Sequence, residues 1–477
     1  MSSAEARSES AGGGARGSVA AWLVAAAFAA PVLAIVLSGH NAGRAAFDSI
    51  VYHEHFIRRL AEEAPTVDLS NPLTATTPGF HMLLAAASLA GLESTTALRL
   101  VAMAIGALLV WCVARWCERV AGRAAGAILA LPLAASVYVI GSGAWLLPDD
   151  LAWLLVAAIV ACCLRPSCTR RDLAIAAALL VPLVLVRQTH LWVAAVVWMA
   201  AFRVRAGESD PGFAQRARRA LPWVVATLPA FAAVALFAWI WGGLVPPRFQ
   251  GELQSLNPAT PAFLCLEFAI LSLGFAPWVA GALVRAWRSA PRAIVAAAVA
   301  GLLLAAVPET TESIAGGRYS GWWVIVGKLP VIAERTGVAM LVLAPAGAAM
   351  LAALLVGVDR ARRPVLAMAV IAFGAAVTMQ HYAWQRYHEP FLLLLLPALC
   401  LLQEDGWRWK PRFALAPLAF AGVLAMVTSR ALHTDPVATG SIPPAVHRAE
   451  GDRYYDGPRR RTDEEVAAAI ADEAARK

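Results

Sequence analysis

Long apolar segments with almost no charge constrain this chain more than any other feature of its sequence. Residues 19–37 contain no charged side chain, and residues 97–114 contain one. Each segment is about as long as the ~20 residues that an α-helix needs to cross the hydrocarbon core of a bilayer. Across all 477 residues, 60% are hydrophobic and 15% are charged, against about half and about a quarter in soluble domains. The sequence therefore predicts an all-α, polytopic bundle of transmembrane helices.

Thirteen apolar segments are candidates for membrane spans. They lie near residues 19–38, 97–114, 124–141, 151–164, 172–186, 188–202, 221–241, 261–283, 293–307, 337–357, 365–379, 390–402 and 413–429. The short segments 172–186 and 188–202 are also consistent with one tilted helix, so we expect about 11–13 spans.

Basic residues are distributed unevenly between alternate loops. If the N-terminus is cytoplasmic, 22 arginines and lysines fall on the inner side and 10 on the outer side. Cytoplasmic loops are normally enriched in these residues. We therefore predict a multi-pass protein of the plasma (inner) membrane, with a cytoplasmic leader over 1–18, a transmembrane domain over 19–430 and a polar tail over 431–477. The net charge of +8 then reflects topology and not nucleic-acid binding.

Two of the predicted outer segments are longer than the other loops. Residues 39–96 contain a charged helical stretch that ends near Glu63, followed by an apolar segment over 80–92. That segment is too short to span a bilayer, so we expect an outer loop of surface helices directly after the first span. The second long segment, residues 308–336, contains Arg318 and Trp322.

Five short sequence patches lie in or beside the predicted outer loops. They are Asp48-Ser49-Ile50, Thr76-Thr77-Pro78-Gly79-Phe80, Arg187-Gln188-Thr189 followed by Trp192, Gly242-Gly243-Leu244-Val245, and Arg386-Tyr387 with Glu389-Pro390. In order and spacing they resemble patches of the dolichyl-phosphate-glucose alpha-1,2-glucosyltransferases. The resemblance implies a GT-C fold, a polyprenyl-phosphate sugar as donor, a glycan or lipid-linked acceptor, and inversion at the sugar. It implies no cofactor.

Two positions depart from that family. Ser49 stands where the family has a second acidic residue, and Pro246-Pro247-Arg248-Phe249-Gln250 replaces the motif that follows its Gly-Gly-Ile-Val. The sequence therefore predicts a hexosyltransferase and leaves the sugar and the acceptor open.

Sugar transfer to an acceptor hydroxyl requires a base that takes the hydroxyl proton. Asp48 is the predicted catalytic base, because it lies in the first outer loop just past a span, where GT-C enzymes place their catalytic acidic residue. Its alternative role is to cap a helix that begins at Ser49. Asp149 and Asp150, in the next outer loop, are predicted to bind the acceptor. The alternatives are a metal-binding role beside Asp48 and, again, an N-cap.

The transfer also requires cations that hold the phosphate as negative charge collects on the leaving group. The predicted phosphate-binding residues are Arg187, Gln188, Arg318 and Arg386. An arginine at the end of a span can instead extend to the lipid headgroups. Thr76 and Thr77, through the resemblance, and Trp322, through its ring, are predicted to bind sugar or acceptor. For Trp322 the alternative is an ordinary interfacial tryptophan.

No metal site is predicted. His53 and His55 are two residues apart and do not face each other on a helix, so we expect them to be surface histidines. The seven cysteines form no Cys-x-x-Cys pair.

A transporter or flippase of lipid-linked sugars is the alternative to an enzyme, and a non-catalytic scaffold is a further one. Transporters place ionisable groups near the bilayer midplane, often in repeated halves. The span centres here are almost free of charge, with Glu267 the deepest exception, and no internal repeat is evident. These features favour chemistry at the outer surface.

Overall fold

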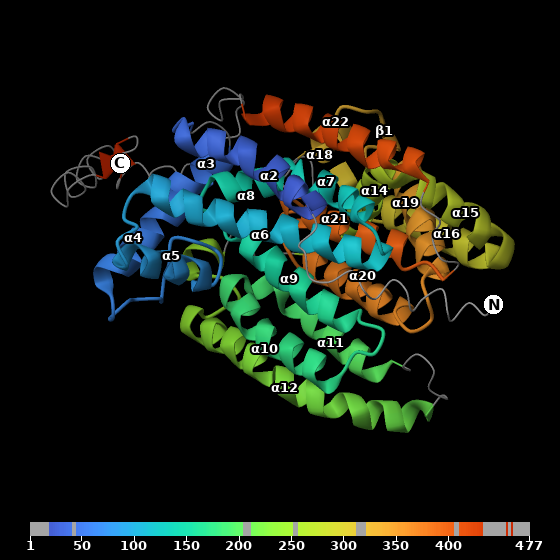
Figure 1. Ribbon diagram of the computed structural model, residues 1–477, viewed down its shortest axis with the longest axis horizontal. Coiled ribbons are helices and arrows are strands. Elements are labelled where there is room, and N and C mark those ends of the chain that lie inside the picture. Colours follow the sequence, from blue (N-terminus) through green and yellow to red (C-terminus); the bar gives the residue numbers. More distant parts are fainter. Residues whose placement is uncertain are drawn as a thin grey trace.

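The chain folds into an all-α bundle. The computed structural model describes residues 19–40, 44–203, 211–250, 256–311, 321–404 and 410–432, together with the two-residue strands β3 (Tyr455–Asp456) and β4 (Arg459–Arg460). The structure is 79% helical, which confirms the predicted all-α class. In Figure 1 the long helix α6 (Thr95–Ala121) crosses the middle of the molecule, and α22 (Leu415–Leu432) lies along its upper edge.

The first part of the chain combines long helices with a set of short ones. Its helices are α2 (Val19–Leu37), α3 (Arg44–Asp48), the π-helix η2 (Ser49–Glu54), α4 (His55–Glu63), α5 (Gly79–Leu89), α6 (Thr95–Ala121), the 3-10 helix η3 (Ala124–Ala130), α7 (Leu131–Ala134) and α8 (Val137–Ala144). α2 packs along α6, and α4 packs on α5 at one end of the molecule (Figure 1). The predicted loop of helices after the first span is therefore present, and α4 ends at Glu63 as expected.

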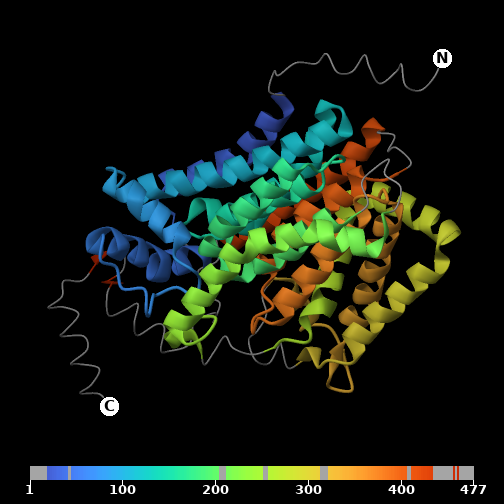
Figure 2. The same cartoon turned by 90° about the horizontal axis from the view of Figure 1, so that it is seen from below.

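The middle of the chain forms a second layer. Its helices are α9 (Asp149–Cys163), α10 (Arg170–Val186), the 3-10 helix η4 (Gln188–Trp192), α11 (Val193–Phe202), α12 (Gly212–Trp241) and the 3-10 helix η5 (Pro247–Phe249). The chain breaks between α10 and α11 because Arg187 has extended backbone angles, so 172–202 is not one tilted helix. α12 lies across both α10 and α11 (Figure 2).

The remaining elements complete the bundle. They are α14 (Thr260–Leu271), η6 (Ser272–Phe275), α15 (Ala276–Ser289), α16 (Pro291–Ala306), α18 (Trp322–Val326), the antiparallel hairpin β1 (Val331–Ile332) and β2 (Thr336–Gly337), α19 (Val338–Gly357), α20 (Arg363–Thr378), α21 (Gln385–Leu401), η7 (Pro411–Ala414) and α22 (Leu415–Leu432). α21 lies at the centre of the bundle, because nearly all its side chains are buried.

Six helical segments among the described residues are long and apolar enough to cross a membrane. They are Val19–Leu37, Thr95–Ala121, Gly212–Trp241, Thr260–Ser289, Val338–Gly357 and Arg412–Leu432. Several other predicted spans are shorter helices, such as α16 and α20 with 16 residues each. The chain is therefore a multi-pass membrane protein by composition and helix length, and length alone supports fewer spans than the predicted 11–13.

The apolar segment predicted as a span near 124–141 is not one unbroken helix. The chain forms η3 and α7, and then turns by 77° into α8. Ser136 starts the new helix, because its hydroxyl accepts a hydrogen bond from the backbone N–H of Tyr138.

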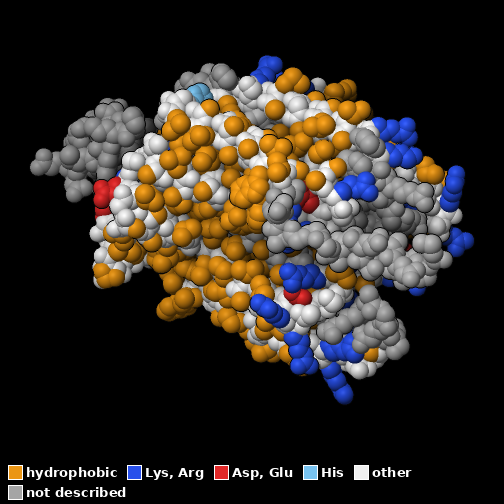
Figure 3. Space-filling model, viewed as in Figure 1, with side chains coloured by type: hydrophobic (Ala, Val, Ile, Leu, Met, Phe, Trp, Pro, Cys, Tyr) orange, Lys and Arg blue, Asp and Glu red, His pale blue; other side chains and the backbone are white. Residues whose placement is uncertain are grey.

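The surface divides into apolar and basic regions. Hydrophobic side chains cover most of the face seen in Figure 3, whereas Lys and Arg gather toward the end where α15 meets α16 and around the start of α12. The helices of the first loop, α4 and α5, lie at the opposite end.

Glycine determines how closely α19 approaches α14. A Cβ atom added at Gly347 would collide with the backbone carbonyl of Cys265, whereas one added at Gly374 in α20 meets nothing within 4 Å. We predict that Gly347→Ala lowers stability by about 1–3 kcal/mol, because packed helices must move apart. Gly374→Ala, the matched control, should be neutral or stabilising by up to about 1 kcal/mol, because alanine favours helix. Thermal unfolding in detergent measures both, and equal melting temperatures for the two variants would contradict this packing.

Candidate functional site

A cavity of about 1000 Å³ lies beside the helices of the first loop. All five sequence patches contribute to its wall. The lining residues from these patches are Asp48, Thr76, Arg187, Gln188, Thr189, Trp192, Gly242, Gly243, Leu244, Val245, Arg386 and Tyr387. Segments far apart in the chain therefore meet around one space.

Asp48 lies at the junction of α3 and the π-helix η2. Its carboxylate contacts a residue that is far away in the sequence. Oδ2 of Asp48 lies 2.5 Å from Nη1 of Arg386, at the start of α21. The hydroxyl of Ser49 accepts a hydrogen bond of 3.0 Å from the backbone N–H of Leu146, which fixes this junction against the segment before α9. The alternative role of Asp48 as a helix cap is wrong, because its side chain makes no capping hydrogen bond.

A second ion pair joins Asp149 and Arg187. Arg187 follows the last residue of α10, and its guanidinium donates to Oδ1 of Asp149 in the first turn of α9. Both side chains are about nine-tenths buried, at 11% and 10% exposure. A buried charge of this kind requires a partner of opposite sign. Asp149 does not cap α9, since the helix has no side-chain capping bond.

Asp150 is placed differently from its neighbour. It is buried beside Phe28 and Gly106, which belong to α2 and α6, and it does not line the cavity. Its position therefore does not support the predicted role in acceptor binding.

Tyr387 lies between the two arginines of these ion pairs. The centre of its ring is 4.8 Å from the guanidinium carbon of Arg187 and 5.0 Å from that of Arg386. Arg386 also donates a hydrogen bond of 3.1 Å to the phenol oxygen. Burial alone would raise the pKa of Tyr387, but the two guanidinium groups outweigh it and lower that pKa. The ring of Tyr387 thus makes a cation–π contact with each of the two guanidinium groups.

Gln188 joins three of the sequence patches through its side-chain amide. Its oxygen accepts a hydrogen bond of 3.1 Å from the backbone N–H of Thr77, and its nitrogen donates to the carbonyls of Ala75 and Leu244 at 2.8 and 3.2 Å. Donors and acceptor are thus engaged with the backbone. The structure therefore gives Gln188 a role in positioning the wall and does not support the predicted contact with phosphate.

Thr77 and Gly79 have structural roles in the same joint. The hydroxyl of Thr77 donates to the carbonyl of Val184 at 2.6 Å, and Thr77 does not line the cavity. A Cβ atom at Gly79 would lie 2.6 Å from the carbonyl oxygen of Leu185, so only glycine allows this approach to α10. Of the two predicted sugar-binding threonines, Thr76 is the one that faces the cavity.

Of the two predicted residues in the second long segment, the structure describes one. Arg318 lies outside the described residues. Trp322 starts α18 and does not line the cavity, and its backbone N–H donates to Oε1 of Gln385 at 2.7 Å.

Sequence reasoning missed an aromatic segment between α20 and α21. Tyr382 and Trp384 line the cavity and stack with ring centres 4.5 Å apart, and Arg386 lies 4.7 Å from the centre of the Trp384 ring. The signal available in the sequence was the spacing of aromatic residues before Arg386-Tyr387.

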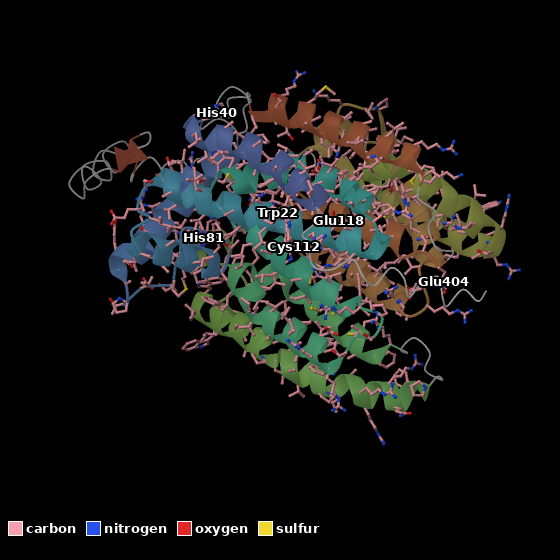
Figure 4. All side chains as sticks on the ribbon, in the orientation of Figure 1. Trp22, His40, His81, Cys112, Glu118 and Glu404 are labelled. Atoms are coloured by element: carbon pink, nitrogen blue, oxygen red, sulfur yellow. The ribbon has the colours of Figure 1, made fainter. Side chains whose placement is uncertain are left out.

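Histidines near Asp48 are also placed differently from the prediction. His53 and His55 are buried, so the expectation of surface histidines is wrong. His53 lines the cavity, and its Nδ1 lies 2.8 Å from Nε2 of His81 in α5. Figure 4 labels His81 among the helices of the first loop, at one end of the molecule. Among the described residues, no group of three His, Cys, Asp or Glu side chains could hold a metal ion.

We predict that breaking the Asp149–Arg187 pair destabilises the protein. Asp149→Leu leaves a buried guanidinium without its carboxylate and should cost about 3–5 kcal/mol. Asp149→Leu combined with Arg187→Met should cost less, because neither charge is then buried alone. The matched control is Glu309→Gln, which breaks an exposed pair with Arg335 and should cost at most about 1 kcal/mol. Unfolding in detergent tests the order, and additive losses in the double variant would contradict it.

His53 predicts a pH dependence of stability. Burial lowers the pKa of His53 to about 3, and the nearby charges of Arg386 and Arg187 contribute in the same direction. An unfolded histidine titrates near 6.5, so the unfolded state binds more protons between about pH 6.5 and 3. Stability should therefore fall as the pH falls through that range. Melting temperatures from pH 7.5 to 4.5 should decline less steeply in His53→Gln, and an unchanged slope would contradict the assignment.

Comparison with known proteins identifies no relative of this chain. No protein-family model matches the chain, and no curated protein or solved structure matches it.

Proposed function

We propose that this protein is an inverting glycosyltransferase that moves a hexose from a polyprenyl-phosphate sugar to a glycan or lipid-linked acceptor. The observation that carries the proposal is a single cavity in which the buried Arg187 and the partly buried Arg386 each lie beside a carboxylate. The five patches that resemble the glucosyltransferase family surround this same cavity.

The two arginines are suited to the phosphate of the donor. Fixed donors in a largely buried site stabilise the negative charge that develops on a leaving phosphate. Guanidinium groups bind phosphate oxygens through two parallel N–H bonds. Both groups contact the ring of Tyr387, and in this proposal the donor phosphate binds in that part of the cavity wall.

Asp48 acts as the base in this proposal. Arg386 engages its Oδ2, and the other carboxylate oxygen accepts the proton of the acceptor hydroxyl. The acceptor oxygen then attacks the anomeric carbon, and the bond from that carbon to the phosphate oxygen breaks. Attack opposite the leaving phosphate inverts the configuration at the sugar.

The cavity continues into an apolar region suited to a polyprenyl chain. Its wall there includes Ala194, Ala195 and Trp198 of α11 and Phe231 and Val234 of α12. Burying an isoprenoid chain against such side chains is favourable in proportion to the apolar area removed from water.

The proposed orientation places the leader in the cytoplasm and the cavity at the outer face of the plasma membrane. It is supported by the basic residues at the end of the molecule opposite α4 and α5 (Figure 3). In a GT-C bundle, the shorter apolar helices would complete the predicted 11–13 spans.

A transporter or flippase of lipid-linked sugars remains the second candidate. Glu267 of α14 is fully buried within a candidate span, where its Oε2 lies 3.6 Å from Nδ1 of His388. Ionisable residues inside a membrane often belong to a transport pathway.

We predict that the purified protein in nanodiscs transfers sugar from at least one polyprenyl-phosphate hexose, and that Asp48→Asn lowers turnover at least about a hundredfold, because a general base contributes that much. Asp68→Asn is the matched control, since Asp68 is an exposed residue of the same loop outside the cavity. Turnover that Asp48→Asn leaves intact would assign the base elsewhere. Failure of the wild type to transfer from any donor, with movement of lipid-linked sugar across liposomes, would favour the flippase.

A further inference from the structure

His53, in the wall of the cavity, is hydrogen-bonded to His81 behind it. The planes of the two rings differ by 2°, their centres are 5.1 Å apart, and Nδ1 of His53 lies 2.8 Å from Nε2 of His81. With the rings nearly parallel, centres separated by this distance place the N···N bond in the common plane of both rings. That is the direction in which an imidazole nitrogen donates or accepts. The N–H of one ring therefore donates a hydrogen bond to the bare nitrogen of the other.

The surroundings of His81 decide which ring donates. His81 is fully buried, with the rings of Phe56 and Phe80 centred 5.0 and 5.7 Å away. Its Nδ1 has no hydrogen-bond partner among the described residues. A proton on Nδ1 would be a buried, unpaired N–H, which native structures rarely tolerate, whereas an unpaired acceptor is tolerated more often. Thus Nε2 of His81 carries the hydrogen atom, and this N–H donates a hydrogen bond to Nδ1 of His53.

This arrangement fixes the tautomer of His53. Since its Nδ1 accepts from His81, the proton of a neutral His53 lies on Nε2. His53 lines the cavity, and Nε2 is the ring nitrogen left for it. Burial and the charges of Arg386 and Arg187 keep the pKa of His53 low, so the ring stays neutral at physiological pH. The cavity thus contains an uncharged N–H donor within the field of two guanidinium groups.

We propose that His53 binds the donor phosphate as a neutral N–H donor, and that His81 is the positioning residue that holds it in this tautomer. The identity of the ligand rests on the proposed function. Phosphate oxygens accept hydrogen bonds, so a site for them needs N–H or O–H donors. A neutral donor adds a hydrogen bond without placing a third positive charge beside Arg187 and Arg386. A base at His53 would need a bare Nε2, which this tautomer does not provide.

Binding of a polyprenyl monophosphate to the protein in nanodiscs, followed by tryptophan fluorescence, tests the donor role. His53→Phe keeps a ring without a donor and should weaken binding about 10- to 100-fold, as expected for a hydrogen bond to a charged group. His53→Gln keeps an N–H near the position of Nε2 and should restore most of the affinity. The matched control is His40→Phe, because His40 bonds to the carbonyl of Leu432 away from the cavity. Competition by inorganic phosphate shows whether the headgroup alone is recognised.

The pattern of variants separates binding from folding. Wild-type affinity in His53→Phe would overturn the proposal, and so would equal losses in His53→Phe and His53→Gln, which indicate a packing role. Nitrogen-15 spectra of labelled histidines, assigned with His53→Gln, should show the Nε2–H tautomer for His53 and lose it in His81→Phe. An Nδ1–H tautomer would also overturn the proposal.

The same variants distinguish this proposal from the proposed function. Lipid-phosphate binding that depends on His53, without sugar transfer by the wild type, would contradict the proposed enzymatic function and support the proposed binding site. Sugar transfer by the wild type, with unchanged affinity in His53→Phe, would support the enzymatic function and contradict the role of His53.

Discussion

The arrangement around the cavity depends on two ion pairs that join distant parts of the chain. Asp48 pairs with Arg386, which is 338 positions away in the sequence. Asp149, at the start of α9, pairs with Arg187, which follows α10. In a protein this apolar, an unpaired guanidinium would be costly to bury, so each arginine fixes the position of its carboxylate. The first pair holds the loop after α2 against the start of α21, the most enclosed helix. Both pairs place their charges in the wall of one cavity.

Sequence alone predicts the elements that depend on local composition. Apolar segments correctly indicate long helices such as α2 and α12, because membrane spans require an uninterrupted apolar stretch. The number of spans is harder to predict, because an apolar helix such as α20 resembles a span in composition but has only 16 residues. The break at Arg187 is another limit. The polar residues Gln188, Thr189 and His190 mark it in the sequence, but the contact of Arg187 with Asp149, 38 positions away, does not appear in any local pattern.

The candidate site was predictable only in part, for a related reason. Asp48, Arg187 and Arg386 stand out because charges are rare beside apolar segments. The side-chain partner that decides a role lies far away in sequence. Gln188 reads as a donor for phosphate until its contacts with the backbone of residues 75–77 and 244 are seen. His53 and His81 are 28 positions apart in different helices, and no local pattern links them.

The ion pairs also bear on how the proposed reaction would be ordered. With two carboxylates and two guanidinium groups, the four paired side chains of the cavity are close to neutral before a donor binds. A phosphate that enters competes with the carboxylates for the same N–H groups, since both are oxygen anions that accept two bonds from a guanidinium. If Arg386 donates some of its N–H bonds to the phosphate, its ion pair with Asp48 weakens. The carboxylate of Asp48 is then free to accept a proton. Donor binding would thus prepare the base, so hydroxyl activation would follow the arrival of the leaving group.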